Sequence, residues 1–240
     1  MEDKLKIEIG TLISDFKNKI KEWNEIYRDF NIQFIYNENL DQLNATSIKY
    51  ILVGDNPGVK EKEHNKYLIG ATGLIARTFF KSELEVSDFN NEVLILNKTP
   101  IHSAKTSELN EICKSSNIDL LQITQEYMCN LVYNLQNLLN CEVIILGFGG
   151  CRINKKWDLK VQTSKKEKTM IHFFLKLREF LMSDKKFAKN VFVAQHFSRG
   201  ILFKEMIKKI DDIENLNKKK FLEYCKVYTE EIKNSKLQKK

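Results

Sequence analysis

Three short apolar runs in this 240-residue sequence each end in residues that can take part in chemistry. The segments that follow them are Gly54-Asp55-Asn56-Pro57-Gly58, Asn97-Lys98-Thr99-Pro100 and Gln195-His196-Phe197-Ser198-Arg199-Gly200. Carboxylate, amide and imidazole groups serve as proton acceptors, proton donors and hydrogen-bond partners in hydrolytic sites. Both prolines of the chain lie in these loops, where proline fixes its own φ angle and favours extended geometry in the preceding residue. The sequence therefore predicts polar side chains held in fixed positions.

Other motifs that carry chemistry are missing from the sequence. A fourth apolar run ends in Gly147-Phe148-Gly149-Gly150, which lacks the spacing, the third glycine and the acidic residue of a dinucleotide-binding turn. No phosphate-binding loop of the form Gly-x-x-x-x-Gly-Lys-Ser/Thr occurs. The five cysteines include no Cys-x-x-Cys pair, which argues against zinc, iron–sulfur clusters and a disulfide framework. We therefore expect a site that uses neither a metal nor a cofactor.

The four apolar runs that must position these loops occupy residues 50–53, 93–96, 143–146 and 191–194. Each run is short and apolar enough to be buried on both faces, and helical patterns separate the runs. Such alternation predicts an α/β fold, a three-layer α/β/α sandwich with a central four-stranded parallel sheet. The expected helices cover residues 4–30, 72–80, 120–139, 169–181, 201–210 and 218–233. In such a sheet a ligand lies outside the carboxyl ends of the strands, so the polar loops should form one site.

The composition bounds the class of protein. The 28.2 kDa chain is 42% hydrophobic and 30% charged, which predicts a soluble globular protein. We expect a single domain over residues 1–240, with a long helix within residues 1–30 and a disordered basic tail at residues 236–240. No apolar run approaches the roughly 20 residues that span a bilayer, and the N-terminus lacks the pattern of a secretory signal. We therefore expect a cytoplasmic monomer with reduced thiols and no membrane contact.

The formal net charge of +7 is distributed unevenly. Residues 1–154 carry 16 basic and 21 acidic side chains, a net of −5, whereas residues 155–240 carry 23 basic and 11 acidic side chains, a net of +12. This asymmetry is typical of proteins that bind an anionic polymer such as DNA. A composition bias is the alternative, because 34 of the 39 basic residues are lysine and the chain is also rich in asparagine and poor in proline.

The strand-end segments resemble those of the uracil-DNA glycosylase superfamily. Gly54-Asp55-Asn56-Pro57-Gly58 is similar to the first motif of that family, which takes forms such as Gly-Gln-Asp-Pro-Tyr, Gly-Glu-Ala-Pro-Gly and Gly-Ile-Asn-Pro-Gly. Residues 67–74 resemble the Phe-Val-Gly-x-Ala-Gly-x-Leu segment of its thermostable bacterial and archaeal branch. Residues 94–97 resemble its Leu-Leu-Leu-Asn strand end, and residues 193–198 resemble the strand that leads into its His-Pro-Ser motif. The four segments follow the family's order over roughly residues 49–205.

This resemblance implies an enzyme that hydrolyses the N-glycosidic bond of uracil, or of a related deaminated base, in DNA. The target base would be flipped out of the helix stack, attacked by water, and assisted as it leaves by a hydrogen bond from His196. The Asp-Pro and Asn-Pro branches of the family place the group that positions the water at the third motif position, here Asn56. The Glu-x-Pro branch uses the second position, here Asp55, so both residues remain candidates.

The resemblance also implies roles in binding. The expected base-binding residues are Gly54, Tyr67, Leu68 and Asn97, and the expected contacts to the DNA backbone are Ser198 and Arg199. Asn97 carries one carbonyl and one amide group, which suits the edge of uracil because that edge offers one acceptor and one donor. Each polar residue has a structural alternative, since Asp, Asn, His and Ser often cap turns and helix ends and Arg199 could be a solvent-exposed residue at a helix start.

The sequence departs from the family at several positions. The iron–sulfur cysteines of the Glu-x-Pro branch are missing, Phe197 replaces the proline of His-Pro-Ser, and Arg199 stands where a second proline often follows. Leu68 stands where a phenylalanine usually stacks on the base, although Tyr67, Phe79 or Phe80 could supply that ring.

Two alternative functions remain beside glycosylase activity. One is a nucleic-acid-binding protein that kept the scaffold without catalysis, and the other is an unrelated α/β enzyme that acts on a small anionic metabolite. The sequence leaves open which base is preferred and whether single or double strands are used.

Overall fold

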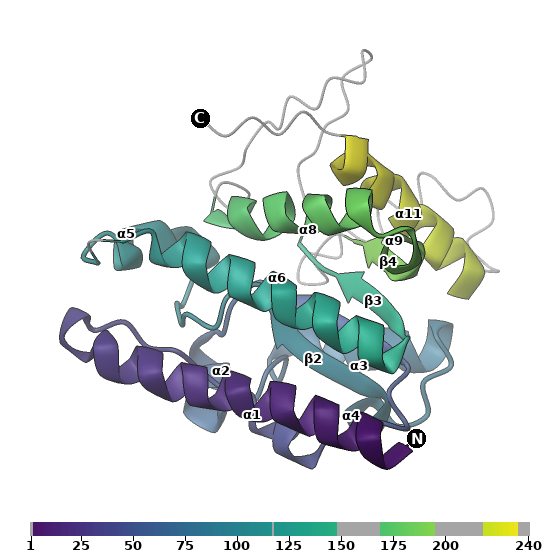
Figure 1. Cartoon of the computed structure of the whole chain (residues 1–240), viewed down its shortest axis with the longest axis horizontal. Helices are drawn as coiled ribbons and strands as arrows, with labels where there is room; N and C mark the ends of the chain where they lie inside the picture. The colour runs from purple at the N-terminus through teal and green to yellow at the C-terminus, as the bar shows by residue number, and fades with distance from the viewer. Residues whose placement is uncertain (1, 117, 148–168, 195–217, 235–240) are drawn as a thin grey trace.

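A parallel sheet of four short strands lies at the centre of the fold (Figure 1). The computed structural model describes residues 2–116, 118–147, 169–194 and 218–234. Within these ranges the strands are β1 (Tyr50–Gly54), β2 (Val93–Asn97), β3 (Glu142–Ile145) and β4 (Val191–Val193). Their spatial order is β2-β1-β3-β4, and all three pairings are parallel. The predicted four-stranded parallel sheet is confirmed, and each strand end lies within one residue of its predicted position.

The strand registers bring the polar loops to one level. Gly54 at the end of β1 pairs with Asn97 at the end of β2, and Val53 pairs with Ile145 at the end of β3. The ladder continues one residue past β3, because Leu146 N donates to Val53 O at 2.9 Å. The residues after β1, β2 and β3 therefore start side by side at the carboxyl edge of the sheet.

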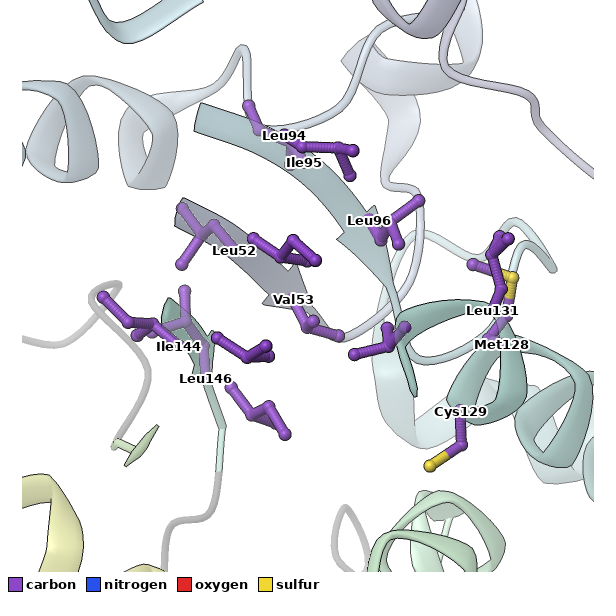
Figure 2. Close-up of a cluster of buried hydrophobic side chains, with 14 of the residues drawn as sticks. Leu52, Val53, Leu94, Ile95, Leu96, Met128, Cys129, Leu131, Ile144 and Leu146 are labelled. Atoms are coloured by element: carbon purple, nitrogen blue, oxygen red, sulfur yellow. The ribbon is translucent and has the colours of Figure 1, made fainter. Parts of the chain in front are cut away.

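Helices α1 (Glu2–Ile26), α6 (Leu120–Leu139) and α8 (Ile171–Ser183) cover one face of the sheet (Figure 1). The ring of Phe16 in α1 lies 6.1 Å from that of Tyr127 in α6, and Gln125 of α6 accepts a hydrogen bond from Phe173 N of α8 at 3.0 Å. Figure 2 shows apolar side chains from β1, β2, β3 and α6 that belong to one buried cluster. The long apolar stripe of α6 accounts for its position against the sheet.

The opposite face carries α3 (Ala71–Glu83), α4 (Phe89–Glu92) and α11 (Lys218–Asn234). Phe80 of α3 packs edge-on against Tyr50 of β1, with ring centroids 5.3 Å apart. The ring of Phe79 in α3 lies 4.7 Å from that of Phe221 in α11, so α3 and α11 share this face. Helices on both faces of the sheet give the three layers that the sequence predicts.

The helix predictions succeed where the apolar stripe is long. The helix expected at 120–139 is α6 with the same bounds, and those expected at 72–80, 169–181 and 218–233 correspond to α3, α8 and α11. The helix expected at 4–30 ends at Ile26, because the chain passes through the 3-10 helix η1 (Arg28–Phe30) to Asn31 at φ 56°. The expected helix at 201–210 and the tail at 236–240 lie outside the described residues.

Several short helices were not predicted. They are α4, α2 (Val59–His64), α5 (Leu109–Cys113), α9 (Lys185–Asn190) and the 3-10 helices η2 (Glu38–Gln42) and η3 (Thr106–Glu108). None exceeds two turns, which is too short for an apolar period to be recognised in the sequence. One of them, α2, follows the first polar loop directly, and five residues separate η3 from the second.

The packing of α6 generates a stability prediction. Leu131 is 4% exposed and belongs to the buried cluster of Figure 2, whereas Ile123 on the same helix is 42% exposed. Leu131→Ala should lower the free energy of unfolding by about 2 to 5 kcal/mol, because it removes buried methyl groups and leaves a cavity. Ile123→Ala should change it by less than about 1 kcal/mol. Urea unfolding measures both, and equal losses would contradict the packing described for α6.

Candidate active site

A cleft of about 600 Å³ opens at the carboxyl ends of β1 and β2. Its described walls come from the strand ends Gly54 to Asn56 and Asn97, from the starts of α2 and α3, and from residues 103–106. Ligands of open α/β sheets bind at this edge, so the position agrees with a functional site. Asp55, Asn56, Asn97, Gly54 and Leu68 all line the cleft, and the structure thus brings together five of the predicted site residues.

Asp55 is held by a buried ion pair. Its side chain is 6% exposed, and its Oδ1 accepts a hydrogen bond from Lys98 Nζ at 2.6 Å, while Lys98 is fully buried. The same ammonium donates to Gly54 O at 3.3 Å and to Leu146 O, and it lies 5.5 Å from the ring centre of Phe174 in α8. One cation thus joins the ends of β1, β2 and β3.

Asn56 is bound into the opposite wall of the cleft. Its Nδ2 donates to Ser103 Oγ at 3.0 Å and to the backbone carbonyls of Ser103 and Pro57 at 3.2 and 3.1 Å. Its Oδ1 accepts from Thr106 Oγ1 at 2.8 Å. Both ends of the amide are therefore engaged within the protein, which is the pattern of a side chain that anchors a loop.

Asn97 has a different environment. Its side chain is 2% exposed and lines the cleft, yet its Nδ2 is buried and makes no hydrogen bond to any described residue. A buried amide donor without a partner costs about 1 to 3 kcal/mol, and such donors are rare in folded proteins. A ligand with an acceptor atom in the cleft would satisfy this donor.

Two glycines allow the close approach of these side chains. A Cβ atom at Gly54 would lie 2.4 Å from Asn97 Oδ1. Gly147 has φ 86°, and a Cβ atom there would lie 2.3 Å from Asp55 Oδ1. Gly54 thus makes room for Asn97, and Gly147 makes room for Asp55. Gly147, the first residue of the glycine-rich segment that fails as a dinucleotide motif, therefore packs against the acid.

Leu68 lies in the cleft wall in a conformation that leucine rarely adopts. It is 5% exposed with φ 51°, its N–H donates to Glu61 Oε1, and its carbonyl accepts from Arg77 Nη1 at 3.0 Å. Glu61 also accepts from Gly58 N at 2.6 Å, and burial raises the pKa of the Glu61 carboxyl. A Cβ atom at Gly73 would lie 1.6 Å from Leu68 O. The strained residue is thus fixed from both sides.

The structure does not bring the expected aromatic ring into the cleft. Tyr67 is fully buried and its hydroxyl donates to Ile35 O, and burial raises the pKa of this phenol well above its usual range. Phe79 and Phe80 are buried in the helical layer against Phe221 and Tyr50. Among the described residues that line the cleft none is aromatic. The apolar side chains of these walls are aliphatic and include Leu68 and Val59.

Three predicted site residues, His196, Ser198 and Arg199, lie outside the described residues. Of the other histidines, His102 is near the cleft, and its Nδ1 lies 3.1 Å from Pro57 O. No group of three or more His, Cys, Asp or Glu side chains is placed to hold a metal ion in the parts of the chain that the structure describes.

Sequence reasoning missed several residues that shape the cleft. They are Lys98, Glu61, Arg77, Ser103 and Thr106. Lys98 directly follows Asn97, but a lysine is solvated by default and nothing in its spacing indicates burial. Glu61 could have been found from its place three residues after Gly58, because this spacing is typical of a helix N-terminal capping box.

A scan against models of known protein families finds no match for this chain, and a search of curated proteins finds none either.

The contact between Gly54 and Asn97 yields a second prediction. Gly54→Ala should lower the free energy of unfolding by about 1 to 3 kcal/mol, because the new methyl group overlaps the Asn97 amide between two buried strands. Gly70→Ala is the matched control, since Gly70 also lines the cleft but has open space at its Cβ position. Its change should stay below about 1 kcal/mol. Urea unfolding of the two variants makes the comparison, and equal losses would contradict the close packing of Asn97 on β1.

Proposed function

We propose that this chain is a uracil-DNA glycosylase-like enzyme, which hydrolyses the N-glycosidic bond of uracil or a related deaminated base in DNA. The observation that carries the proposal is Asn97, whose buried amide donor has no described partner and borders the same cleft as Asp55. Uracil offers a carbonyl oxygen beside an N–H group, which matches an amide side chain. The resemblance of residues 49–205 to the glycosylase motifs supports the same proposal.

The reaction needs two charges to be stabilised. The bond between the sugar C1′ and the base nitrogen breaks, the electron pair leaves with the base, and the oxygen of a water molecule bonds to C1′. Asp55 accepts the proton of that water and faces the developing positive charge on the sugar. His196, in the role that the resemblance gives it, donates to the base anion, and such a donor is worth about 3 to 4 kcal/mol in a site that excludes water.

Asp55 suits the water-positioning role better than Asn56. The carboxylate of Asp55 borders the cleft, whereas the amide of Asn56 is engaged at both ends with Ser103 and Thr106. A group that must accept a proton is also better served by a carboxylate than by an amide, which has no basic lone pair in this pH range.

The proposed partner is DNA, bound largely through its phosphates. The excess of basic residues in 155–240, which include Arg199, provides the positive charge, and Ser198 would donate a neutral hydrogen bond to the backbone. The exposed Lys60 and Lys105 lie at the cleft. Flipping a base out of the stack costs a few kcal/mol and is easiest at mismatched pairs such as U·G. Contacts to the backbone offset this cost, and binding should weaken steeply with salt.

We place the protein in the cytoplasm as a monomer. No helix in the described ranges is long and apolar enough to cross a membrane. The four cysteines that the structure describes are free and buried, as expected in a reducing compartment. Burial raises the pKa of the Cys113 and Cys141 thiols to about 12, which makes them poor nucleophiles.

A nucleic-acid-binding protein without catalysis is the second candidate. The observation that favours it is the lack of an aromatic ring among the described cleft residues, because stacking on such a ring is a common way to hold a flipped base. This candidate shares the DNA-binding surface with the first and differs only in turnover.

An excision assay separates the two candidates. Duplex and single-stranded oligonucleotides that contain uracil opposite guanine or adenine, hypoxanthine, or mismatched thymine are incubated with the protein in EDTA, and abasic sites are cleaved and counted. The proposal expects excision of at least one of these bases, undiminished by the chelator. Salt-dependent binding without excision would favour the second candidate, and neither binding nor excision would reject both.

Asn97 provides a sharper prediction. Asn97→Ala should lower the single-turnover excision rate by about 100-fold or more, because it removes the donor to the base. It should leave the free energy of unfolding unchanged or higher, since it also removes a buried donor without a described partner. Asn134→Ala, on the exposed side of α6, is the control and should change neither quantity. Loss of stability in step with activity would assign Asn97 a structural role instead.

A further inference from the structure

Lys98 is the one lysine that is buried in the described part of the chain. Its ammonium donates to Asp55 Oδ1 at 2.6 Å, to Gly54 O at 3.3 Å and to Leu146 O, and it lies 5.5 Å from the ring centre of Phe174. A lysine keeps its charge in such a place only when anionic and dipolar groups replace its lost water. The surroundings of Lys98 provide this replacement.

The two members of the pair differ in their access to ligands. Asp55 lines the cleft, whereas Lys98 is fully buried and is not among the cleft-lining residues. A molecule in the cleft therefore meets the carboxylate and not the ammonium. Because a buried ion pair adds little stability compared with an apolar pair of the same size, stability alone is a weak reason for this arrangement.

We propose that Lys98 is a positioning residue that keeps Asp55 ionised and turned toward the cleft, so that Asp55 and not Asn56 positions the attacking water. The inference rests on the proposed glycosylase function and adds a residue to it. Because Asp55 lines the cleft and Lys98 does not, the ammonium can hold the carboxylate through Oδ1 without itself occupying the cleft. The same contact partly offsets the negative charge, which makes Asp55 an acceptor at low pH as well as at neutral pH.

Other charged groups near the Asp55 carboxylate could also change the pH dependence of the excision rate. Glu61 and Lys60 of α2 and Lys105 of the loop after β2 line the same cleft, and the imidazole of His102 contacts Pro57 O. Burial raises the pKa of Glu61, so the titration of this residue can add a second pH-dependent change to the excision rate. The titration of Asp55 must therefore be observed directly.

The test compares the wild type with Lys98→Met and Lys98→Arg. The titration midpoint of Asp55 is measured by ¹³C NMR of labelled aspartate, and the single-turnover excision rate is measured from pH 4 to pH 10. In Lys98→Met both the Asp55 midpoint and the acidic limb of the rate profile should move up by about 1 to 3 pH units. The rate should fall about 10-fold for each pH unit below the new midpoint and recover toward pH 9, and Lys98→Arg should restore part of the shift.

Lys49→Met is the matched control. Lys49 Nζ lies 2.7 Å from Glu92 Oε2 at the opposite end of β1 and β2, and this contact, with a hydrogen bond from Ser87, lowers the pKa of Glu92 to about 2. The control therefore also removes a lysine from a carboxylate at the edge of the sheet, but far from the cleft. Its excision profile should keep the wild-type limb.

The outcomes are distinct. A lower rate in Lys98→Met at every pH, with both midpoints unmoved, would assign Lys98 a purely structural role and overturn the inference. A shifted Asp55 midpoint in a protein whose wild type excises no base would support the positioning of Asp55 by Lys98 and reject the glycosylase function. An unshifted midpoint without excision would overturn both.

A double variant covers the case in which Lys98→Met does not fold. Asp55→Asn with Lys98→Met replaces the pair by neutral groups of similar size, which removes the uncompensated buried charge. If Asp55 positions the water, this variant should fold and lose excision by about 100-fold or more at every pH, while DNA binding stays within a few-fold. A folded double variant with the wild-type rate would overturn the inference and return the role to Asn56.

Discussion

The contact between Lys98 and Asp55 is the interaction on which the carboxyl edge of the sheet depends. The ammonium satisfies a carboxylate and two strand-end carbonyls that are buried together, from β1 and β3, and it is itself carried by the residue after β2. Without the cation, a carboxylate and two carbonyls would lie close together in a region of low dielectric, where unpaired polar groups are costly. The strand ends can meet at one level because this charge is present.

Backbone positions without side chains make the arrangement possible. The parallel register sets Gly54 beside Asn97, and only a residue without Cβ leaves room for the amide there. Gly147, two residues after β3, likewise leaves room for Asp55, and it has a left-handed conformation that favours glycine. The polar side chains of the site thus lie where the backbones of neighbouring strands approach closely, and the longer side chains that line the cleft surround them. Leu68, held in a left-handed conformation by Glu61 and Arg77, is the one strained wall residue among these.

The sheet and the long helices could be predicted because their information is local. The stripe of α6 repeats with the period of a helix, the strands are short apolar runs buried on both faces, and the parallel arrangement follows from their alternation with helices. The same logic placed Asp55, Asn56 and Asn97 at one edge. The burial of Lys98, the inward turn of Tyr67 and the φ angle of Leu68 could not be predicted, because each depends on residues 30 or more positions away or on strain that the fold imposes. Lys98 contacts Asp55 43 positions earlier and Leu146 48 positions later, and Tyr67 contacts Ile35 32 positions earlier.

If the cleft holds a base, as we propose, the chemistry of the described walls sets which bases it distinguishes. An aromatic wall holds any base by stacking, a contribution of about 1 to 3 kcal/mol that is insensitive to base identity. Leu68 offers less of this, so a larger share of recognition falls on hydrogen bonds. The Asn97 Nδ2 group can donate a hydrogen bond to a base that has a carbonyl at the facing edge. An amino group at that edge would be disfavoured, because two donors would then meet in a buried place. Deamination replaces an amino group by a carbonyl, as in the change from cytosine to uracil. Under the proposed function, the same donor would select the class of deaminated bases over their parents, through the cost of leaving a buried group unpaired.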